Sequence, residues 1–334
     1  MKLVIYDENW RLYRPLLERY LGASWSISAG AGTLAWLLEE VQEADALLAL
    51  KLPPEALALA HRLRVFLYPG AGVMQKDSGA LPEGCSLCNV YEHEVPISEY
   101  VLMVILMHAT QILRHSSNFR HGNWDGNGRC GGEVHEEVNG KTLGLVGFGR
   151  IAQAVAIRAQ AFGLCVEAIR RDPQAPLSPQ WASIVHSVYG PDRICDLFSR
   201  SDFIVIACDL NEETKEWIGW RELSHIRPQS LLVNVSRAEI IQEEPLFRVL
   251  EQRRFSAALD VWYRYPKTSR ERLEGSRFPL QQLPNVLPTP HFSAWTGSML
   301  ERRMKRIAEN LERLSRGEPL ERVVTVGTWK PSVA

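Results

Sequence analysis

The sequence has few cysteines, no hydrophobic run of membrane-spanning length and almost no net charge. Six cysteines among 334 residues are too few for a disulfide scaffold, and a chain of this length can bury a core without one. Lysine and arginine total 38 against 39 aspartates and glutamates, so the net charge of −1 argues against binding nucleic acid mainly through charge. The most apolar stretch, Tyr100–Leu113, is too short to cross a bilayer. We therefore expect neither a nucleic-acid nor a membrane partner.

The first residues and the overall composition indicate a soluble globular protein. Asp7 places an acidic side chain too early for a secretory signal, so the expected compartment is the cytoplasm, where thiols stay reduced. Apolar residues make up 46% and charged residues 23%, which is unlike a disordered chain. At roughly 150 residues per domain, the length suggests about two domains.

Short apolar runs alternate along the chain with segments of helical periodicity. The predicted strands are Leu3–Tyr6, Ala46–Leu50, Val65–Tyr68, Leu87–Val90, Thr142–Val146, Cys165–Ile169, Phe203–Ala207, Leu231–Val235 and Ala257–Val261. The main predicted helices are Trp10–Tyr20, Ser98–Arg114, Ile151–Phe162 and Ser298–Arg316. This alternation is typical of an α/β fold with doubly wound parallel sheets.

A glycine-rich turn follows one predicted strand and opens a predicted helix. It has the spacing of the dinucleotide-binding fingerprint in the strand–turn–helix setting that the fingerprint requires. Gly147 would form the tight turn, and Gly149 would let the backbone approach a pyrophosphate at the helix N-terminus. The alternative is an ordinary strand-to-helix turn. We favour a dinucleotide site, with a pyrophosphate held by Gly147, Gly149, Arg150 and Ile151.

The end of the next strand bears on which dinucleotide would bind. An acidic residue about 20 positions after the turn suits the ribose hydroxyl of NAD, whereas arginine suits the 2′-phosphate of NADP. Arg170 lies 23 positions after Gly147 and is followed by Arg171, while Asp172 falls in the expected turn. Two guanidinium groups can clamp a phosphate, although they could also be a solvated basic pair. We expect NADP, with NAD as the alternative.

Further motifs accompany the turn in the order and spacing of one enzyme family. They are Asn139–Gly144, Ser201-Asp202, Asn211–Thr214, Val233–Arg237, Ala258–Val261, Leu283–Val286 and Thr289–His291. On these motifs the chain resembles the D-isomer-specific 2-hydroxyacid dehydrogenases over nearly its whole length. The resemblance implies a Rossmann nucleotide-binding domain inserted into a flavodoxin-like substrate domain. Residues 1–98 and 294–334 would form the substrate domain and residues 99–293 the nucleotide domain, with the helix near Ser98–Arg114 building a homodimer.

The resemblance also assigns two catalytic residues. Reduction of a 2-oxo acid needs a cation that fixes the carboxylate and a general acid that protonates the forming alkoxide. Arg237 matches the family arginine of the first role, and its planar guanidinium suits a carboxylate. His291 matches the family acid/base, because an imidazole of near-neutral pKa can give and take the proton.

The third catalytic position departs from the family. Most relatives carry glutamate five positions after the aspartate of the Asp260-Val261 pair, where this chain has Tyr265. A phenol can hydrogen-bond an imidazole but cannot stabilise imidazolium as a carboxylate does. Three hypotheses remain open: Tyr265 orients His291, a carboxylate such as Glu94 or Glu99 does so, or turnover is weak or altered. The tyrosine could also be plain packing.

The remaining site residues follow from the resemblance. Relatives hold the substrate carboxylate with backbone N–H groups of a loop that corresponds to Pro69–Val73. The implied substrate-binding residues are Ala71, Gly72, Val73 and Trp295. The implied cofactor-binding residues beyond the turn are Arg170, Arg171, Cys208, Thr214, Val235, Ser236, Arg237, Asp260, His291 and Ala294. The chemistry needs no metal, and no metal ligand is assigned.

Three functions fit these observations. The first is an NADP-preferring oxidoreductase that interconverts a small 2-oxo acid and its D-2-hydroxy acid. The second keeps the cofactor but acts on another small anion, such as a phosphonate-type acid. The third is a dinucleotide-sensing scaffold with little turnover, which the missing glutamate favours and the retained Arg237 and His291 oppose.

Overall fold

The computed structural model describes residues 1–30, 33–72, 81–268 and 270–329. Contacts divide the chain into two compact units, and each is described on its own. The first unit is Met1–Glu92 together with Trp295–Ala334, and the second unit is His93–Ala294. The second unit is therefore inserted into the sequence of the first. The borders that the family resemblance implies lie after residues 98 and 293, whereas the contacts place them after residues 92 and 294.

The first unit is built around one sheet. In the part of the chain that the structure describes, its strands run in the order β13-β5-β4-β3-β1-β2, parallel except for β13. The strands are β1 Lys2–Tyr6, β2 Ser26–Gly30, β3 Ala46–Ala49, β4 Val65–Tyr68, β5 Ser86–Asn89 and β13 Val323–Val326. The helices are α1 Trp10–Tyr20, α2 Leu34–Glu40, α3 Pro54–Leu59 and α11 Gly297–Ser315.

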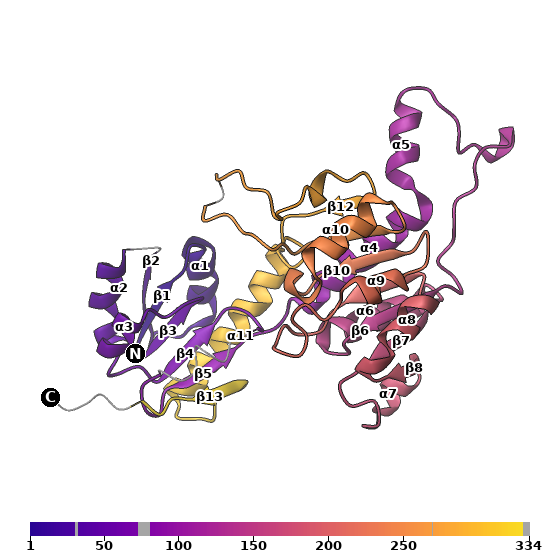
Figure 1. The fold of residues 1–334 in the computed structure, drawn as a ribbon. Helices are drawn as coiled ribbons and strands as arrows, with labels where there is room; N and C mark the ends of the chain where they lie inside the picture. Colours follow the sequence, from indigo (N-terminus) through magenta and orange to yellow (C-terminus); the bar gives the residue numbers. More distant parts are fainter. Residues whose placement is uncertain (31–32, 73–80, 269, 330–334) are drawn as a thin grey trace. The chain divides into compact units, whose positions relative to one another are not determined.

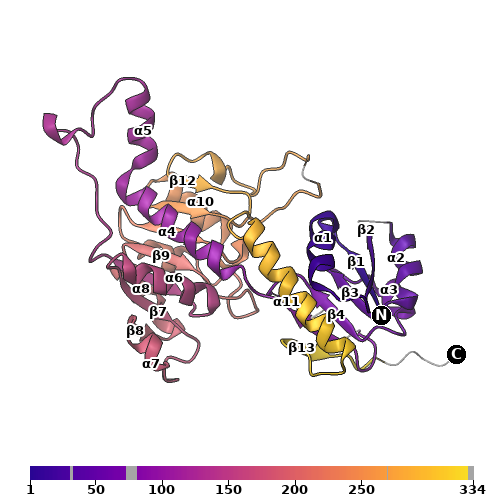
Figure 2. The same cartoon turned by 180° about the vertical axis from the view of Figure 1, so that it is seen from behind.

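Alternation along the central strands of this sheet creates two cores. Successive side chains point to opposite faces, so Leu3 and Ile5 enter one core while Val4 enters the other. The first core packs under α1 and α11, which lie side by side in Figures 1 and 2. The second core lies under α2 and α3. Helices on both faces make this sheet doubly wound.

The second unit contains a wholly parallel sheet in its described residues, in the order β12-β11-β10-β9-β6-β7-β8. The strands are β6 Thr142–Val146, β7 Cys165–Ile169, β8 Val185–Tyr189, β9 Phe203–Ile206, β10 Leu231–Asn234, β11 Ser256–Leu259 and β12 Val286–Pro288. The helices are α4 Glu94–Thr110, α5 Ile112–Arg120, α6 Arg150–Ala161, α7 Pro179–Ala182, α8 Ile194–Arg200, α9 Trp220–Ser224 and α10 Glu243–Glu251.

Two cores also flank this second sheet. One face packs under α4 and α6, which contact each other, and the opposite face under α8, α9 and α10. The order of β6 to β9 reverses between β6 and β9, which are neighbours in the sheet. Ligands of doubly wound sheets bind outside the carboxyl ends of the strands at such a reversal. The predicted α/β class with two doubly wound parallel sheets is confirmed.

One predicted helix is wrong in its extent. The expected helix Ser98–Arg114 is two helices, because Gln111 adopts a left-handed backbone with φ of 52° and ends α4. The axes of α4 and α5 differ by 59°. No single helix among the described residues is long and apolar enough to span a membrane, although this bent pair passes by length and composition.

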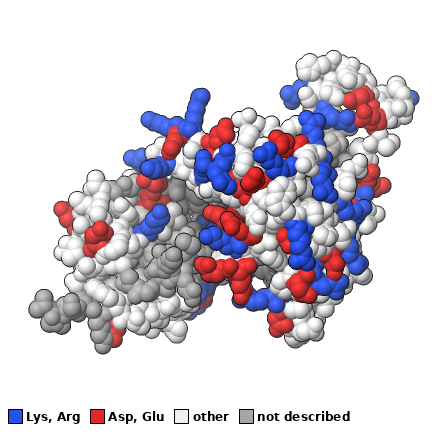
Figure 3. All heavy atoms as spheres, in the orientation of Figure 1, with Lys and Arg blue, Asp and Glu red and all other residues white. Residues whose placement is uncertain are grey.

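Acidic and basic side chains are interspersed over the surface that Figure 3 shows. Many of them pair locally, as Arg193 does with Asp196 and Arg248 with Glu251. Such exposed pairs stabilise a fold by at most about 1 kcal/mol each. The mixed surface agrees with a net charge of −1.

Candidate active site

The glycine-rich turn lies at the carboxyl end of β6, next to the reversal of strand order. Gly147 has φ of 93°, and a Cβ there would lie 2.8 Å from backbone atoms of Cys208. Glycine is therefore required by both conformation and space. Gly149 caps the N-terminus of α6, and a Cβ there would meet open space, so its backbone is accessible. Ala152 is fully buried in the helix–sheet contact, as the third position of the fingerprint demands.

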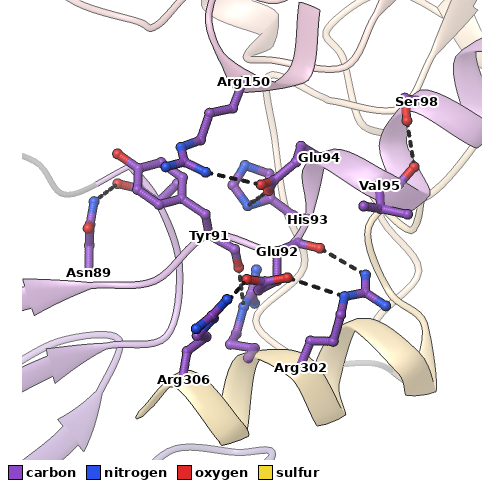
Figure 4. Close-up of polar contacts among 12 residues, drawn as sticks. Asn89, Tyr91, Glu92, His93, Glu94, Val95, Ser98, Arg150, Arg302 and Arg306 are labelled. Carbon is purple, nitrogen blue, oxygen red and sulfur yellow. Dashed lines mark hydrogen bonds and ion pairs between the residues drawn. The ribbon is translucent and has the colours of Figure 1, made fainter. Parts of the chain in front are cut away.

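Arg150 begins α6 directly after the turn and is one of the residues predicted to hold the pyrophosphate. Its guanidinium lies 3.4 Å from a carboxylate oxygen of Glu94 at the start of α4 (Figure 4). The other oxygen of Glu94 is buried without a hydrogen-bond partner among the described residues. This acidic partner holds Arg150 in place, and Ile151 beside it is half-buried.

The end of β7 carries the residues predicted to choose the dinucleotide. Arg170 Nη1 donates to the Ala175 carbonyl at 2.9 Å, which folds the guanidinium against the following turn. One carboxylate oxygen of Asp172 accepts the N–H groups of Gln174 and Ala175 at 3.0 and 3.2 Å. Arg171 is exposed and lies 3.5 Å from Glu213. The carboxylate of Asp172 is thus engaged in its own turn, whereas Arg170 and Arg171 directly follow the end of β7.

The loops after β9 and β10 are tied to each other. The Ser236 hydroxyl donates to the carbonyl of Cys208, whose thiol has its pKa raised to about 12 by burial. The Thr214 hydroxyl donates to the Asp209 carbonyl at 2.6 Å and closes the loop after β9. Val235 is buried. Cys208, Val235 and Ser236 therefore lie just after the strand ends, whereas the Thr214 side chain closes its own loop.

Arg237 stands at the surface just after β10. Asn234 fixes this turn from both sides, since its amide donates to the Arg237 carbonyl at 3.0 Å and its oxygen accepts the Ser236 N–H at 3.1 Å. The Arg237 guanidinium donates to the Ser236 carbonyl at 2.7 Å and is otherwise exposed. Its remaining donors are available to an anion.

His291 sits in a strained turn that Asp260 holds. The backbone of His291 has φ of 55°, which is uncommon for histidine. Asp260 is only 1% exposed, and its carboxylate accepts the Thr289 hydroxyl at 2.6 Å and the N–H groups of Phe292 and Ser293 at 3.0 Å. Asp260 is also a predicted cofactor-binding residue, and in the structure its carboxylate accepts these three hydrogen bonds inside the loop. It therefore positions the histidine.

Tyr265 is hydrogen-bonded to His291. The phenol oxygen lies 2.9 Å from Nδ1 of His291 and accepts the Trp262 backbone N–H at 3.1 Å. The phenol O–H can donate to Nδ1 of the neutral imidazole, and the phenol oxygen can accept the Nδ1–H when the ring is protonated. Burial lowers the pKa of His291, the nearby Asp260 opposes this, and the Arg237 charge adds to it. Tyr265 has its own pKa raised, mainly by burial.

The two glutamates considered as substitutes for the family carboxylate are engaged elsewhere. Glu94 pairs with Arg150 in the way described above. Glu99 lies 3.8 Å from Arg158 of α6. The hypothesis that Tyr265 orients the imidazole is therefore the one that the hydrogen bonds favour.

The partner of His291 leads to a pH prediction. The acid form needed for reduction is present below the pKa of His291, so the reduction rate should fall as pH rises through a value below the usual 6.5 or so. Tyr265→Glu should raise that pKa and move the falling limb to higher pH, in a rate profile measured from about pH 5 to 9. Tyr265→Phe should cost roughly 0.5–1.5 kcal/mol of transition-state stabilisation.

Tyr189→Phe is the matched control, since Tyr189 donates to buried Glu167 at 3.3 Å on the edge strand β8. It should leave the profile unchanged. If neither Tyr265→Glu nor Tyr265→Phe changes the rate or its pH profile, Tyr265 is a packing residue.

The first unit contains the predicted substrate loop after β4. Gly70, Ala71 and Gly72 follow Pro69, and the Ala71 carbonyl accepts the Asn89 side-chain amide at 2.8 Å (Figure 4). Ala71 is half-buried and Gly72 exposed. Val73 lies outside the described residues.

Two predicted residues flank the second border between the units. Trp295 belongs to the first unit and is 45% exposed. Ala294 belongs to the second unit, where it packs against the core under α4 and α6. Among the described residues, no three His, Cys, Asp or Glu side chains are placed to hold a metal ion.

Several positioning residues were missed by the sequence analysis. Tyr100 lies 3.0 Å from the Thr289 hydroxyl, and Trp262 donates its indole N–H to the Thr289 carbonyl at 2.8 Å. Asn234 brackets Arg237. Thr289, Trp262 and Asn234 all stand inside or beside motifs noted in the sequence, and that proximity was the available signal.

Comparison with known proteins places this architecture in a family. The family model described as D-isomer specific 2-hydroxyacid dehydrogenase, NAD binding domain, matches residues 102–293. The chain is 31% identical over 296 residues to D-3-phosphoglycerate dehydrogenase of Methanocaldococcus jannaschii, covering 87% of this chain and 53% of that protein. It therefore spans about half the length of that relative.

A second relative is similar in length. The chain is 29% identical over 295 residues to glyoxylate reductase of Thermococcus gammatolerans, covering 84% of this chain and 83% of the relative. The solved structure of a D-isomer specific 2-hydroxyacid dehydrogenase family protein from Aeromonas salmonicida has the same fold, with a TM-score of 0.79 and 23% sequence identity. The match covers 97% of this chain and 98% of that chain. The chain belongs to the D-isomer-specific 2-hydroxyacid dehydrogenase family.

Proposed function

We propose that the protein is an NADP(H)-dependent oxidoreductase that interconverts a small 2-oxo acid and the corresponding D-2-hydroxy acid. The observation that carries the proposal is the arrangement around His291, whose ring is bonded by Tyr265 and whose turn is held by Asp260. A scaffold without turnover has no need of an imidazole held in this way. The glyoxylate reductase and phosphoglycerate dehydrogenase relatives agree with a small anionic substrate.

The proposed roles follow from the chemistry of each group. When bound, the nicotinamide supplies or accepts the hydride. Arg237 binds the substrate carboxylate through its free N–H donors, and its charge polarises the carbonyl. His291 gives a proton to the forming alkoxide and takes it back in the reverse reaction. Arg237 and the loop amides bind anions in general, so a phosphonate-type acid is the alternative substrate class.

The proposal is tested by following NADPH oxidation with a panel of 2-oxo acids, glyoxylate, hydroxypyruvate and pyruvate among them. Reduction of at least one of them with NADPH supports it. NADPH binding without oxidation across the panel supports the scaffold instead. No NADPH binding at all would contradict both.

The preference for NADP rests on Arg170 and Arg171. Arg170→Asp should weaken NADPH binding roughly ten- to hundredfold and leave NADH binding little changed, because charge-assisted contacts to the 2′-phosphate are worth about 1.5–3 kcal/mol. Dissociation constants from nicotinamide fluorescence check this. Arg193→Gln, which removes an exposed arginine paired with Asp196, is the control. Equal use of NADH and NADPH by the wild type would contradict the preference.

The homodimer is proposed from the exposed apolar surface around α4 and α5. A cavity of about 1030 Å³ here is lined by apolar side chains that include Met103, Ile112, Phe119 and Trp124, and it lies away from His291. Phe119 and Trp124 are 56% and 61% exposed, which is costly for such large rings unless a partner covers them. A second copy is the expected partner, and gel filtration should give twice the monomer mass. We also propose the cytoplasm as the compartment.

A further inference from the structure

The loop Pro69–Gly72 contains three consecutive carbonyl groups, and each of them accepts a hydrogen bond. The Pro69 carbonyl accepts Nη1 of Arg303 at 2.9 Å. The Gly70 carbonyl accepts the Val90 N–H at 3.0 Å, and the Ala71 carbonyl accepts the Asn89 side-chain amide at 2.8 Å. The donors come from β5, the residue after it and α11, all within the first unit.

These bonds determine where the loop amides point. In a planar trans peptide the C=O and N–H groups point in opposite directions. Because the Gly70 carbonyl faces Val90, the Ala71 N–H points away from Val90. Because the Ala71 carbonyl faces Asn89, the Gly72 N–H points away from Asn89. No described residue accepts a hydrogen bond from either N–H, and neither residue is buried. Two neighbouring donors are thus turned outward, as an anion-binding loop requires.

Arg303 is unusual because it is a cation in the core. It projects from α11 and is only 7% exposed. Its Nε donates to the Tyr91 carbonyl at 3.2 Å, while Nη1 holds the Pro69 carbonyl. A guanidinium presents several donors in a fixed plane, so one side chain can fix two chain segments at once. Arg303 therefore joins the loop to the segment that follows β5.

Neighbouring side chains of α11 hold the same segment. The Glu92 backbone has φ of 80°, and its carboxylate lies 3.2 Å from Arg302 and 3.4 Å from Arg306 (Figure 4). Arg302 also donates to the Glu92 carbonyl at 3.3 Å. Side chains of α11 thus hold Tyr91 and Glu92, and Asn89, two residues before Tyr91, donates its side-chain amide to the Ala71 carbonyl.

We propose that Asn89 and Arg303 are positioning residues that keep the Ala71 and Gly72 amides turned outward to bind the anionic group of the substrate. This inference rests on the proposed function for the identity of the ligand, a 2-oxo acid. It assigns the orientation of the loop to side chains from β5 and α11, 18 and 234 positions away from their acceptors.

Asn89→Ala should raise KM for the preferred 2-oxo acid about tenfold, with kcat changed less than about twofold and NADPH binding unchanged. Arg303→Met should act in the same direction, and Arg303→Lys should recover part of the effect because an ammonium can still donate to the Pro69 carbonyl. Asn310→Ala is the matched control. It removes an amide bonded to the Glu321 backbone at 2.8 Å in the same unit, so it should lower thermal stability without raising KM.

Oxalate binding to the NADPH-saturated protein, measured by calorimetry, tests the loop without turnover. The wild type should bind oxalate about tenfold more tightly than Asn89→Ala. If the wild type reduces no 2-oxo acid, the proposed function fails, and the oxalate comparison still decides the role of the loop. Folded Asn89→Ala and Arg303→Met variants with wild-type KM and oxalate affinity would overturn the inference. So would a KM increase of equal size in Asn310→Ala.

Discussion

Replacing His291 with alanine should lower kcat for 2-oxo acid reduction by about 10²–10⁴-fold, the usual contribution of a positioned general acid. NADPH affinity should stay within about twofold, because the imidazole acts on the substrate proton. The expected loss is specific to this histidine, since Tyr265 bonds its Nδ1 and Asp260 holds its turn. Steady-state rates and fluorescence titration of NADPH are the measurements.

His108→Ala is the matched control for that substitution. His108 also lies in the second unit, and burial lowers its pKa as it does for His291, but its ring bonds the Gln229 carbonyl. It should cost stability and leave kcat largely intact. A His291→Ala variant with near-normal kcat would remove His291 from the mechanism.

Replacing Arg237 with alanine should lower kcat/KM by at least about hundredfold. Each charge-assisted hydrogen bond to a carboxylate is worth about 1.5–3 kcal/mol, and a guanidinium makes two in parallel. Arg237→Lys keeps the charge but not the planar pair of donors, so it should recover only part of the loss. Since the Arg237 side chain is exposed and bonds only the Ser236 carbonyl in the described residues, neither variant should unfold the protein.

Thermal unfolding and NADPH titration separate the role of Arg237 from a structural one. Both variants should melt within a few degrees of the wild type and bind NADPH normally. If alanine and lysine at this position behave alike, the planar fork plays no part. If alanine leaves kcat/KM unchanged, Arg237 does not bind the substrate.

The sequence predicted the interior of both sheets and missed their edges. Every strand recognised beforehand has two neighbours in its sheet, and most are buried on both faces. The strands not recognised are β2, β8, β12 and β13, which form the edges of the two sheets in the part of the chain that the structure describes. Edge strands are half-solvated, as the sequence of β2, Ser-Ile-Ser-Ala-Gly, illustrates, so they lack a continuous apolar run.

The break between α4 and α5 was hidden for a different reason. The residues on both sides of Gln111 continue the apolar helical pattern, and glutamine itself favours helix. The left-handed backbone at Gln111 lies at the point where the helix axis turns by 59°. Neither glycine nor proline occurs at or next to Gln111, so helix propensities gave no signal of the break.

The site was predictable where its chemistry is local in sequence. The dinucleotide fingerprint of Gly147–Ala152 occupies six consecutive residues, and family motifs pointed to Arg237 and His291 as candidates. Contacts between distant segments could not be predicted this way. The bond between Arg303 and Pro69 joins residues 234 positions apart, and that between Tyr100 and Thr289 joins residues 189 apart. Such pairs depend on the sheet order, which no local pattern encodes.

The most direct test of the central claim is transfer of label from the nicotinamide to the substrate. The protein is incubated with a 2-oxo acid and NADPH deuterated at one or the other face of nicotinamide C4, and the product is analysed by chiral chromatography and mass spectrometry. We predict that one of the two labelled cofactors, and not the other, places a single deuterium on C2 of the D-2-hydroxy acid. Product without deuterium from either cofactor, or product of the L configuration, would contradict the account.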